Sequence, residues 1–326
     1  MLVAVTGATG FVGQALCARL RSLGHQPQSV PRQPLYENLL SLMVTQRVEV
    51  IYHLAGAGRS TGSNDHHREA NLETTRDVAR AIEDSGFAGN LVFASTAAVY
   101  GSVGPTRVQE GPPLSGAAGG VREGPPLRGA AGGVREDAQP RPCSPLGETK
   151  WASEKLLLSR LGRLCNVRIA RLFNLFGPGQ RKLVVYELAC RILGGQRPLQ
   201  VLGNGQELRD FVYIDEAVRG LTHLASLDDT RGALPAGSAE PLVINICSGV
   251  ALRIEDLARS LLKLAGREED ELLHFLPQTP ESRTEACVGD PERLAQLGVR
   301  VQPPSLENFR ATLEWCGAYR SSCEVR

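Results

Sequence analysis

The chain has 326 residues, of which 42% are hydrophobic, so it can bury a sizeable core and is not disordered throughout. Lys and Arg number 36 against 35 Asp and Glu, and the net charge of +1 gives no general attraction to nucleic acid or to an acidic membrane. The chain has no apolar run of membrane-spanning length, no room for a leader before the first strand, and no C-x-x-C pair among its eight scattered cysteines. We therefore expect a soluble cytoplasmic protein with free thiols.

The first predicted element is a short apolar strand, Leu2–Val5, which a glycine-rich turn follows at once. Helical periodicity follows the turn, and Gly24 marks the end of that helix. In this order Gly7 permits the tight turn, Gly10 lets backbone approach a pyrophosphate, and Gly13 allows the helix to pack closely on the strand. Three glycines alone are often a plain structural turn, but the order of strand, turn and helix favours dinucleotide binding. The predicted cofactor-binding residues of the turn are Gly7, Thr9, Gly10, Phe11, Val12 and Gly13.

The second strand, Gln28–Val30, should carry the residue that contacts the adenosine ribose. No Asp or Glu stands at its end to bind the 2′-hydroxyl; Arg32 stands there, and a guanidinium suits the 2′-phosphate of NADP. Arg32 as an ordinary surface arginine is an open alternative, so we expect NAD or NADP, with Arg32 favouring NADP. Only about twenty residues separate Val30 from the next strand at Ile51, which predicts that one strand on the adenine side is short or missing.

A tandem repeat lies in the loop between Thr96 and Leu146. Its period is 13 residues, because Val108–Gly120 is followed by the similar Val121–Gly133. The repeat is rich in Gly, Pro and Ala and poor in large apolar residues, so residues 108–133 are expected to form a mobile insertion. A partner-binding role of this insertion stays open.

Eight motifs follow one another in a fixed order: Thr6–Gly13, Ile51–Gly56, Glu69–Arg76 around Asn71, Leu91–Gly101, Ser144–Lys155, Arg171–Gly179, Gly203–Asp215 and Asn245–Gly249. Together they resemble the extended short-chain dehydrogenase/reductase family, the NAD(P)-dependent nucleotide-sugar epimerases, dehydratases and reductases. The resemblance implies an α/β fold, a Rossmann-type doubly wound parallel sheet with a smaller C-terminal α/β substrate-binding part. It implies a dinucleotide-binding domain at 1–170, and a mainly substrate-binding part at 171–326 that is interleaved with it.

The resemblance also implies which residues are catalytic. In this family a tyrosine transfers the proton of the sugar hydroxyl, and a lysine four residues later lowers its pKa and holds the nicotinamide ribose. Lys150 matches the lysine, and Thr96 matches a hydroxyl that bonds the same sugar oxygen. Leu146 occupies the tyrosine position, and a leucine cannot carry a proton. The segment expected beside the nicotinamide ribose is Leu54, Ala55 and Gly56.

Three substitutes for the missing tyrosine can be considered. Tyr100 matches a packing tyrosine of the family, and its use as a surrogate acid/base stays open, as does a water between Thr96 and Lys150. Glu148 is expected on another face of the helix from Leu146 and Lys150.

The substrate side matches the family more fully. Asn174 and Arg209 match positions that hold the diphosphate of a nucleotide-sugar, a task that suits the guanidinium fork. A structural ion pair between Arg209 and Asp210 is the alternative. A second arginine of the family has no clean match, because Arg283 is three residues out of register relative to Asp290.

These features predict an NAD(P)-binding, epimerase/dehydratase-like oxidoreductase that is weakly active or inactive because of Leu146. The alternative is a non-catalytic dinucleotide-binding scaffold or regulatory subunit. We expect a nucleotide-sugar as partner, a possible homodimer through helices that the family uses, and no nucleic acid, membrane or metal, since His53, His66 and His67 show no ligand spacing.

Overall fold

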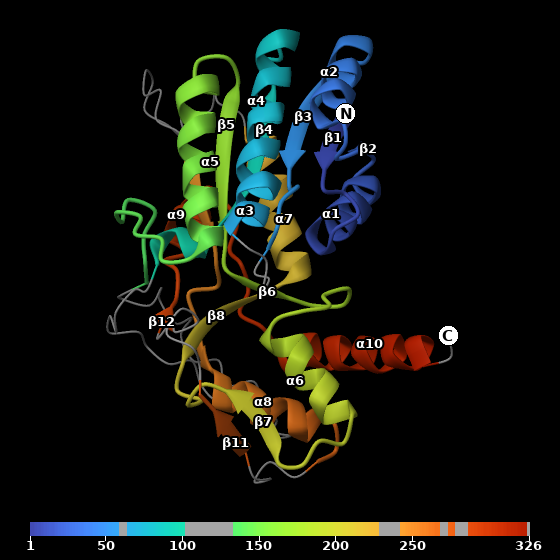
Figure 1. Cartoon of the computed structure of the whole chain (residues 1–326), viewed down its shortest axis with the longest axis vertical. Coiled ribbons are helices and arrows are strands. Elements are labelled where there is room, and N and C mark those ends of the chain that lie inside the picture. The colour runs from blue at the N-terminus through green and yellow to red at the C-terminus, as the bar shows by residue number, and fades with distance from the viewer. Residues whose placement is uncertain (59–63, 102–132, 228–241, 268–272, 278–285, 325–326) are drawn as a thin grey trace.

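A computed structural model describes residues 1–58, 64–101, 133–227, 242–267, 273–277 and 286–324. The chain forms a large sheet flanked by helices and a smaller α/β part beside one end of it (Figure 1). The tandem repeat at 108–133 lies, apart from its last residue, outside the described residues. None of the helices within these ranges is long and apolar enough to span a membrane.

The large sheet has six parallel strands in the order β2-β1-β3-β4-β5-β9. The strands are β1 (Leu2–Thr6), β2 (Gln26–Val30), β3 (Val48–His53), β4 (Asn90–Thr96), β5 (Asn166–Leu172) and β9 (Leu242–Ile246). Apart from the edge strand β2, which is polar and largely exposed, the strands are mostly apolar and buried, as expected for a parallel sheet that is covered on both faces.

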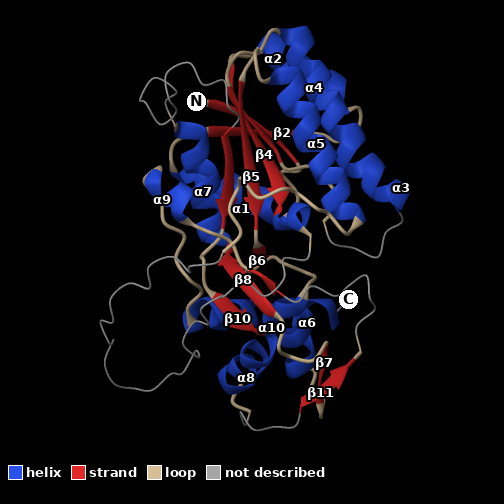
Figure 2. Ribbon diagram, turned by 90° about the vertical axis from the view of Figure 1, so that its left-hand side faces the viewer, coloured by secondary structure: helices blue, strands red, loops and turns tan. Residues whose placement is uncertain are grey.

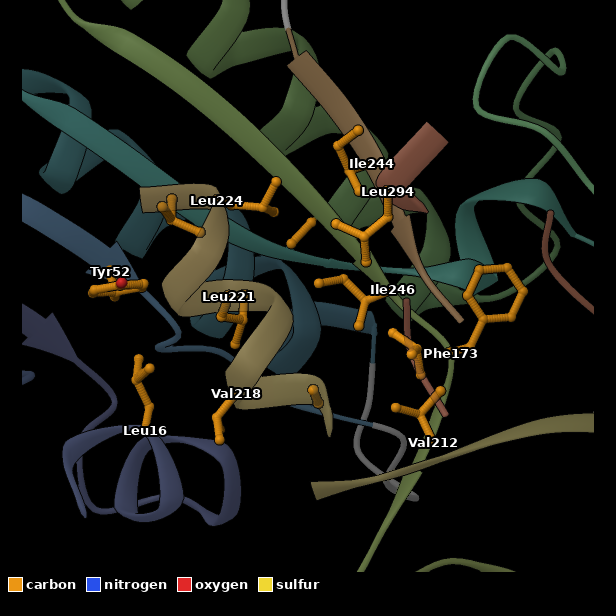
Figure 3. Packing of buried hydrophobic residues seen from close by; sticks show 14 of the residues in the cluster. Leu16, Tyr52, Phe173, Val212, Val218, Leu221, Leu224, Ile244, Ile246 and Leu294 are labelled. Atoms are coloured by element: carbon orange, nitrogen blue, oxygen red, sulfur yellow. The ribbon is translucent and has the colours of Figure 1, made fainter. Parts of the chain in front are cut away.

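Helices cover both faces of this sheet (Figure 2). One face carries α1 (Phe11–Ser22) and α7 (Ile214–Ser226), whose apolar residues pack with Tyr52 and Ile246 of the sheet (Figure 3). The other face carries α2 (Leu35–Thr45), α4 (Thr74–Ser85) and α5 (Pro145–Leu161). This arrangement confirms the predicted doubly wound Rossmann-type fold.

The edge of the sheet beyond β2 confirms the prediction of a missing strand. The chain between Val30 and Val48 contains α2 and no strand, and β2 is hydrogen-bonded to β1 alone. In the common doubly wound order a further strand stands outside the second one. Here the connection crosses β1 directly, because it is long enough only for one helix.

The smaller part is built mainly from the later residues. Strand β8 (Leu208–Tyr213) pairs with β6 (Asn174–Phe176), β10 (Ala251–Arg253) and β12 (Ala286–Cys287), and β7 (Leu199–Leu202) pairs with β11 (Leu273–Leu276). The apolar faces of α6 (Val184–Leu193), α8 (Ile254–Leu264) and α10 (Leu306–Glu324) meet around Phe176 and Phe309. Because α7 and β9 return to the large sheet, the two parts are interleaved in sequence. The short helices are α3 (Asn64–His67), the π-helix η1 (Arg68–Glu73), the 3-10 helix η2 (Ala97–Tyr100) and α9 (Glu292–Gln296).

Candidate active site

A cavity of about 390 Å³ lies at the carboxyl ends of β1, β3, β4 and β5. Ligands of open parallel α/β sheets bind at this end of the strands. The cavity is lined by the glycine turn, the segments after β3 and β4, the first turns of α5, and the segment from 172 to 183. Arg209 also lines the cavity, so six of the sequence motifs, which are far apart along the chain, meet around one space.

The glycine turn has the backbone that its sequence predicts. Gly7 has a φ of 72°, in the left-handed region. The backbone of Leu54 and Ala55 leaves no space for a side chain there, because a Cβ would lie 2.7 Å from the Ala55 nitrogen. A Cβ at Gly13 would lie 2.1 Å from the Gly7 carbonyl oxygen, so only glycine lets α1 pack this closely on the turn. The turn leaves the amino end of α1 at the cavity, and such an end favours anions.

The structure brings most, though not all, of the predicted cofactor-binding residues to the cavity wall. The residues that line it are Gly7, Gly10, Phe11, Val12, Gly13, Leu54, Gly56 and Lys150. Thr9 is exposed beside the turn, and the Ala55 amide is buried and donates to Thr6 Oγ1 at 3.2 Å. Arg32 is exposed just after β2 and is not part of the cavity wall. A ligand role of these three residues stays a prediction.

A buried hydrogen-bond network joins β1, β3 and α4 next to the cavity. His53 is fully buried; its Nδ1 lies 2.8 Å from Thr6 Oγ1 and its Nε2 lies 3.0 Å from Thr75 Oγ1. The Thr75 hydroxyl donates to the Asn71 carbonyl at 2.6 Å, so it accepts from His53, and the proton of the neutral ring is on Nε2. Burial lowers the pKa of His53 to about 3, and the nearby Lys150 charge acts in the same direction.

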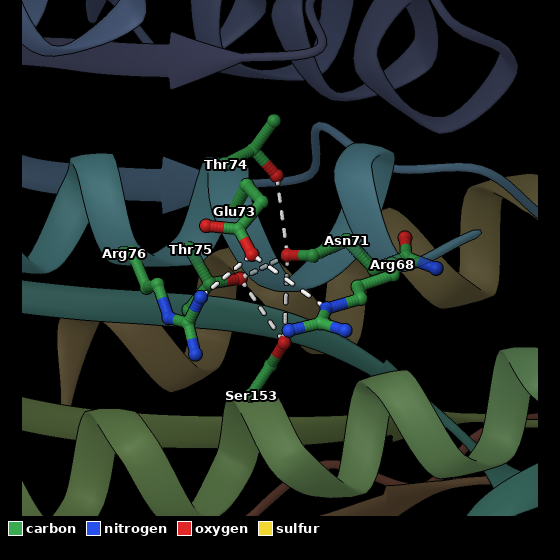
Figure 4. Close-up of polar contacts among 7 residues, drawn as sticks. All are labelled: Arg68, Asn71, Glu73, Thr74, Thr75, Arg76 and Ser153. Carbon is green, nitrogen blue, oxygen red and sulfur yellow. Dashed lines mark hydrogen bonds and ion pairs between the residues drawn. The ribbon is translucent and has the colours of Figure 1, made fainter. Parts of the chain in front are cut away.

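Asn71 links the network to the segment after β3 and to α5. Its Oδ1 accepts from the Ala57 amide at 3.0 Å, and its Nδ2 donates to Thr149 Oγ1 at 3.0 Å. The close-up in Figure 4 shows Asn71 and Thr75 of the η1–α4 region facing Ser153 of α5. Asn71 thus joins the segment after β3 to α5 through its side-chain hydrogen bonds.

Helix α5 presents both Leu146 and Lys150 to the cavity. The Ser144 hydroxyl accepts a hydrogen bond from the Gly147 amide at 3.2 Å and caps the helix. Residues four apart on a helix share one face, which explains why Leu146 and Lys150 both reach the cavity. Lys150 Nζ donates to the Ala94 carbonyl at 2.8 Å and lies 4.5 Å from the Phe93 ring centroid. Thr96 lines the same cavity, and its hydroxyl accepts from the Ala98 amide at 3.2 Å.

Tyr100 faces away from this space. Its hydroxyl donates to Asn245 Oδ1 at 2.7 Å and accepts from Arg171 Nη1 at 2.9 Å, and the residue is 4% exposed. Burial raises the pKa of Tyr100 above its usual range, although Arg171 opposes the shift. A phenol that is enclosed in this way cannot exchange a proton with a ligand in the cavity. Glu148 is exposed and does not line the cavity.

A buried ion pair holds α5 against the sheet. Arg171 donates to Glu154 Oε2 at 2.7 Å and to Oε1 at 3.1 Å, with the two side chains 3% and 0% exposed. Ser95 also donates to Glu154 Oε1. Arg171 further donates to the Glu136 carbonyl at 3.2 Å, so the pair connects α5, β4 and β5 to the chain that follows the insertion.

Asn174 and Arg209, the two residues predicted to bind substrate, both line the cavity. Both also line an adjoining cavity of about 260 Å³ between the start of α6 and β8. Asp210 points elsewhere: its carboxylate accepts from the Ser248 hydroxyl at 2.7 Å and from the amides of Ser248 and Gly249 at 2.9 Å. Neighbouring strand residues face opposite sides of a sheet, so the geometry disfavours the expected alternative of an Arg209–Asp210 ion pair. Arg283 lies outside the described residues.

The polar cavity residues that were not among the predicted site residues include Ser95, Cys143, Ser144, Gln180 and Lys182. Lys182 approaches the segment after β3, where a Cβ at Gly58 would lie 3.0 Å from its Nζ. Gln180 lines both cavities, and Cys143 stands just before the α5 cap. The two basic residues Arg181 and Lys182 directly follow the Gly177–Gln180 turn and were a usable signal, but the approach of Lys182 to Gly58 depends on tertiary structure.

Comparisons with known proteins agree with this architecture. The model of the NAD dependent epimerase/dehydratase family matches residues 3–237. The uncharacterized UDP-glucose epimerase YtcB of Bacillus subtilis is 29% identical over 325 residues, which cover 86% of this chain and 94% of that protein. The dTDP-L-rhamnose 4-epimerase of Burkholderia thailandensis is 27% identical over 339 residues, covering 92% and 90% of the two chains.

Solved structures are similar along nearly the whole chain. MoeE5 in complex with UDP-glucuronic acid and NAD has a TM-score of 0.77 at 26% identity, over 98% of this chain and 100% of that chain. RMD from Pseudomonas aeruginosa complexed with NADPH has a TM-score of 0.75 at 23% identity, over 97% and 99% of the two chains, and shares the fold.

Proposed function

Because this chain belongs to the NAD-dependent epimerase/dehydratase family, we propose that it binds a nicotinamide dinucleotide and a nucleotide-sugar but turns substrate over slowly or not at all. The observation that carries the proposal is the position of Leu146, which lines the cavity one helical turn before Lys150. No tyrosine is among the described residues that line this cavity.

The cavity suits a dinucleotide on physical grounds. Gly10 lines the cavity without a side chain, so a pyrophosphate can approach its backbone closely. The amino end of α1 offers N–H groups to the same pyrophosphate. Lys150 carries two N–H groups besides the one that it donates to Ala94, which are suited to ribose hydroxyls. A bound nicotinamide would supply hydride transfer at the sugar carbon.

The nucleotide-sugar is proposed for the substrate side. MoeE5 is known in complexes with UDP-glucuronic acid and with UDP-glucose, each together with NAD. In this chain Arg209 and Asn174 would contact the diphosphate, and the adjoining cavity would accept the nucleoside.

The missing step is proton transfer at the sugar hydroxyl. Thr96 can donate or accept one hydrogen bond to that oxygen, but its hydroxyl has no tendency to ionise near neutral pH. General acid/base groups contribute about 10²–10⁴-fold, so a chain without one retains binding and loses most of its rate. A non-catalytic scaffold or regulatory subunit that binds the dinucleotide is the second candidate, and Leu146 favours it too.

The test introduces a phenol hydroxyl at position 146. NADH and NADPH are titrated by fluorescence into the wild type, Leu146→Tyr and Leu146→Phe, and each form is assayed with UDP-glucose and UDP-glucuronic acid. We expect all three to bind dinucleotide and only Leu146→Tyr to gain turnover, by about 10²–10⁴-fold. The phenylalanine variant is the matched control, because it adds the ring without the hydroxyl.

Two results would oppose the proposal. Wild-type turnover as fast as that of Leu146→Tyr would show that proton transfer has another source. Absence of any NADH or NADPH binding to the folded wild type would remove the dinucleotide from the proposal.

A further inference from the structure

Lys150 lies on the cavity wall, and within the described part of the chain its amine forms no ion pair with a carboxylate. The side chain is 7% exposed, and its Nζ is held by the Ala94 carbonyl at 2.8 Å and by the Phe93 ring. The Glu154 carboxylate, one turn further along α5, is engaged by Arg171 and Ser95. The Lys150 amine is therefore oriented by a neutral carbonyl and an aromatic face, next to an apolar Leu146.

The surroundings of Lys150 favour its neutral form more than water does. Burial lowers the pKa of Lys150 to about 8, and the Glu154 charge only partly opposes this shift. His53 is neutral behind the wall, and the other cations that line the cavity are Lys182 and Arg209. With such a pKa roughly a tenth of the amine is unprotonated at pH 7, against less than about a thousandth for an ordinary lysine.

We propose that Lys150 is a nucleophilic amine that condenses with small aldehydes and ketones in this cavity. A lysine that is desolvated in a partly apolar pocket is the usual form of an imine-forming residue. The neutral Nζ forms a bond to the carbonyl carbon. The carbonyl oxygen takes up two protons, one from the amine nitrogen and one from solvent, and leaves as water, and the nitrogen keeps one hydrogen in the protonated imine. No oxidant or reductant is needed, and solvent reaches the open cavity to exchange the protons.

The amine assignment rests on the proposed function of the same site. A tyrosine at position 146 would place a phenol beside the Lys150 amine, whereas Leu146 places an alkyl group there. The imine is proposed for the chain without dinucleotide, since Lys150 is also the expected ribose contact. A carbonyl compound and a dinucleotide should therefore exclude each other at this residue. The same amine would serve as a ribose holder in one state and as a covalent site in the other.

The chain has few lysines, so the label on each of them can be quantified separately. The sequence has four lysines, Lys150, Lys155, Lys182 and Lys263. Lys155 is the matched control, because it lies on the same helix but is exposed, above the Trp151 ring. The full chain is treated with benzaldehyde and cyanoborohydride between pH 6 and pH 10, and the reductively alkylated lysines are quantified by peptide mass spectrometry.

We expect Lys150 to be labelled at pH 7 at least tenfold faster than Lys155, with a half-maximal rate near pH 8 for Lys150 only. Lys150→Arg should remove this fast label and leave the others. Equal or slower labelling of Lys150 in the folded wild type would overturn the inference, and the label on Lys155 shows that the reagents worked. Saturating NADH should protect Lys150; fast labelling without any NADH binding would reject the proposed function and keep the amine assignment.

Discussion

At the residue scale, the chemistry of this chain depends on which side chains reach one cavity wall. Leu146 and Lys150 reach it from the same helix face, and Arg209 reaches it from the opposite side. Tyr100, which is close in sequence to Thr96, is turned into the interior by Asn245 and Arg171. Leu146 therefore places an alkyl group, which can neither donate nor accept a proton, among the polar groups that line this wall.

Arg32 provides a prediction about the cofactor. The side chain is exposed at the end of β2 and is free to meet a phosphate from solvent. Hydrogen bonds to charged groups are worth about 1.5–3 kcal/mol, so Arg32→Ala should weaken NADPH binding roughly tenfold or more and leave NADH binding unchanged. Fluorescence titration of both cofactors measures this ratio.

Arg47→Ala is the matched control, because Arg47 is also exposed but precedes β3, at the other end of the sheet. An unchanged ratio of the two dissociation constants in Arg32→Ala would identify Arg32 as an ordinary surface arginine.

At the element scale, α5 is the part that joins the cavity to the rest of the molecule. Its inner face places Lys150 at the cavity and Glu154 against Arg171 of β5, and Thr149 receives the Asn71 hydrogen bond. The helix is fixed by polar contacts on its buried side in addition to apolar ones. Its position relative to β4 and β5 thus sets where Leu146 and Lys150 lie on the cavity wall.

Removal of one member of the buried pair should destabilise the whole chain strongly. Arg171→Met leaves the Glu154 carboxylate buried without its cation, which typically costs about 3–5 kcal/mol. The matched control is Arg160→Met, on the helix that carries Glu154, because Arg160 pairs with Glu83 at side-chain exposures of 38% and 28% and its loss should cost about 0–1 kcal/mol. Urea unfolding followed by circular dichroism gives both values; a similar loss in the two variants would contradict the assignment.

At the scale of the whole molecule, the two parts meet around polar clusters that join distant segments. Asp210 accepts hydrogen bonds from Ser248, Gly249 and Gly289, and it thereby connects β8 to the ends of β9 and β12. On the other side of the cavity, His53 connects β1, β3 and α4. Such clusters form only when the whole chain is folded, so their protonation is coupled to global unfolding.

The buried His53 makes the free energy of unfolding depend on pH. Its pKa falls from 6.5 to about 3 on folding, so below pH 6.5 the unfolded chain binds a proton that the folded chain does not. This contribution is present above pH 6.5 and is lost as the pH falls toward 3, by about 2 kcal/mol between pH 7 and pH 5.

The measurement compares urea unfolding of the wild type and His53→Gln at pH 7 and pH 5. The variant is expected to be less stable at pH 7, because Thr6 and Thr75 lose their ring partner, and to have a smaller loss toward pH 5. An identical pH dependence in both proteins would show that His53 titrates normally in the folded state.

The sequence by itself determined those features that depend on neighbouring residues. The spacing of Gly7, Gly10 and Gly13 requires a tight turn before a helix, and a separation of four residues places Leu146 and Lys150 on one helix face. The short interval after Val30 excluded an extra edge strand. Local backbone geometry and periodicity are properties of a short stretch of chain, so they can be inferred before the fold is known.

Only the tertiary structure decided which polar groups are enclosed and which face the cavity. Tyr100 is turned inward by Asn245, which is 145 residues away, and Lys182 approaches Gly58 from another part of the chain. The lowered pKa of Lys150 likewise arises from burial among β3, β4 and α5 rather than from its sequence neighbours. Long-range packing sets desolvation and hydrogen-bond partners, and these quantities decide whether a titratable side chain is reactive or structural.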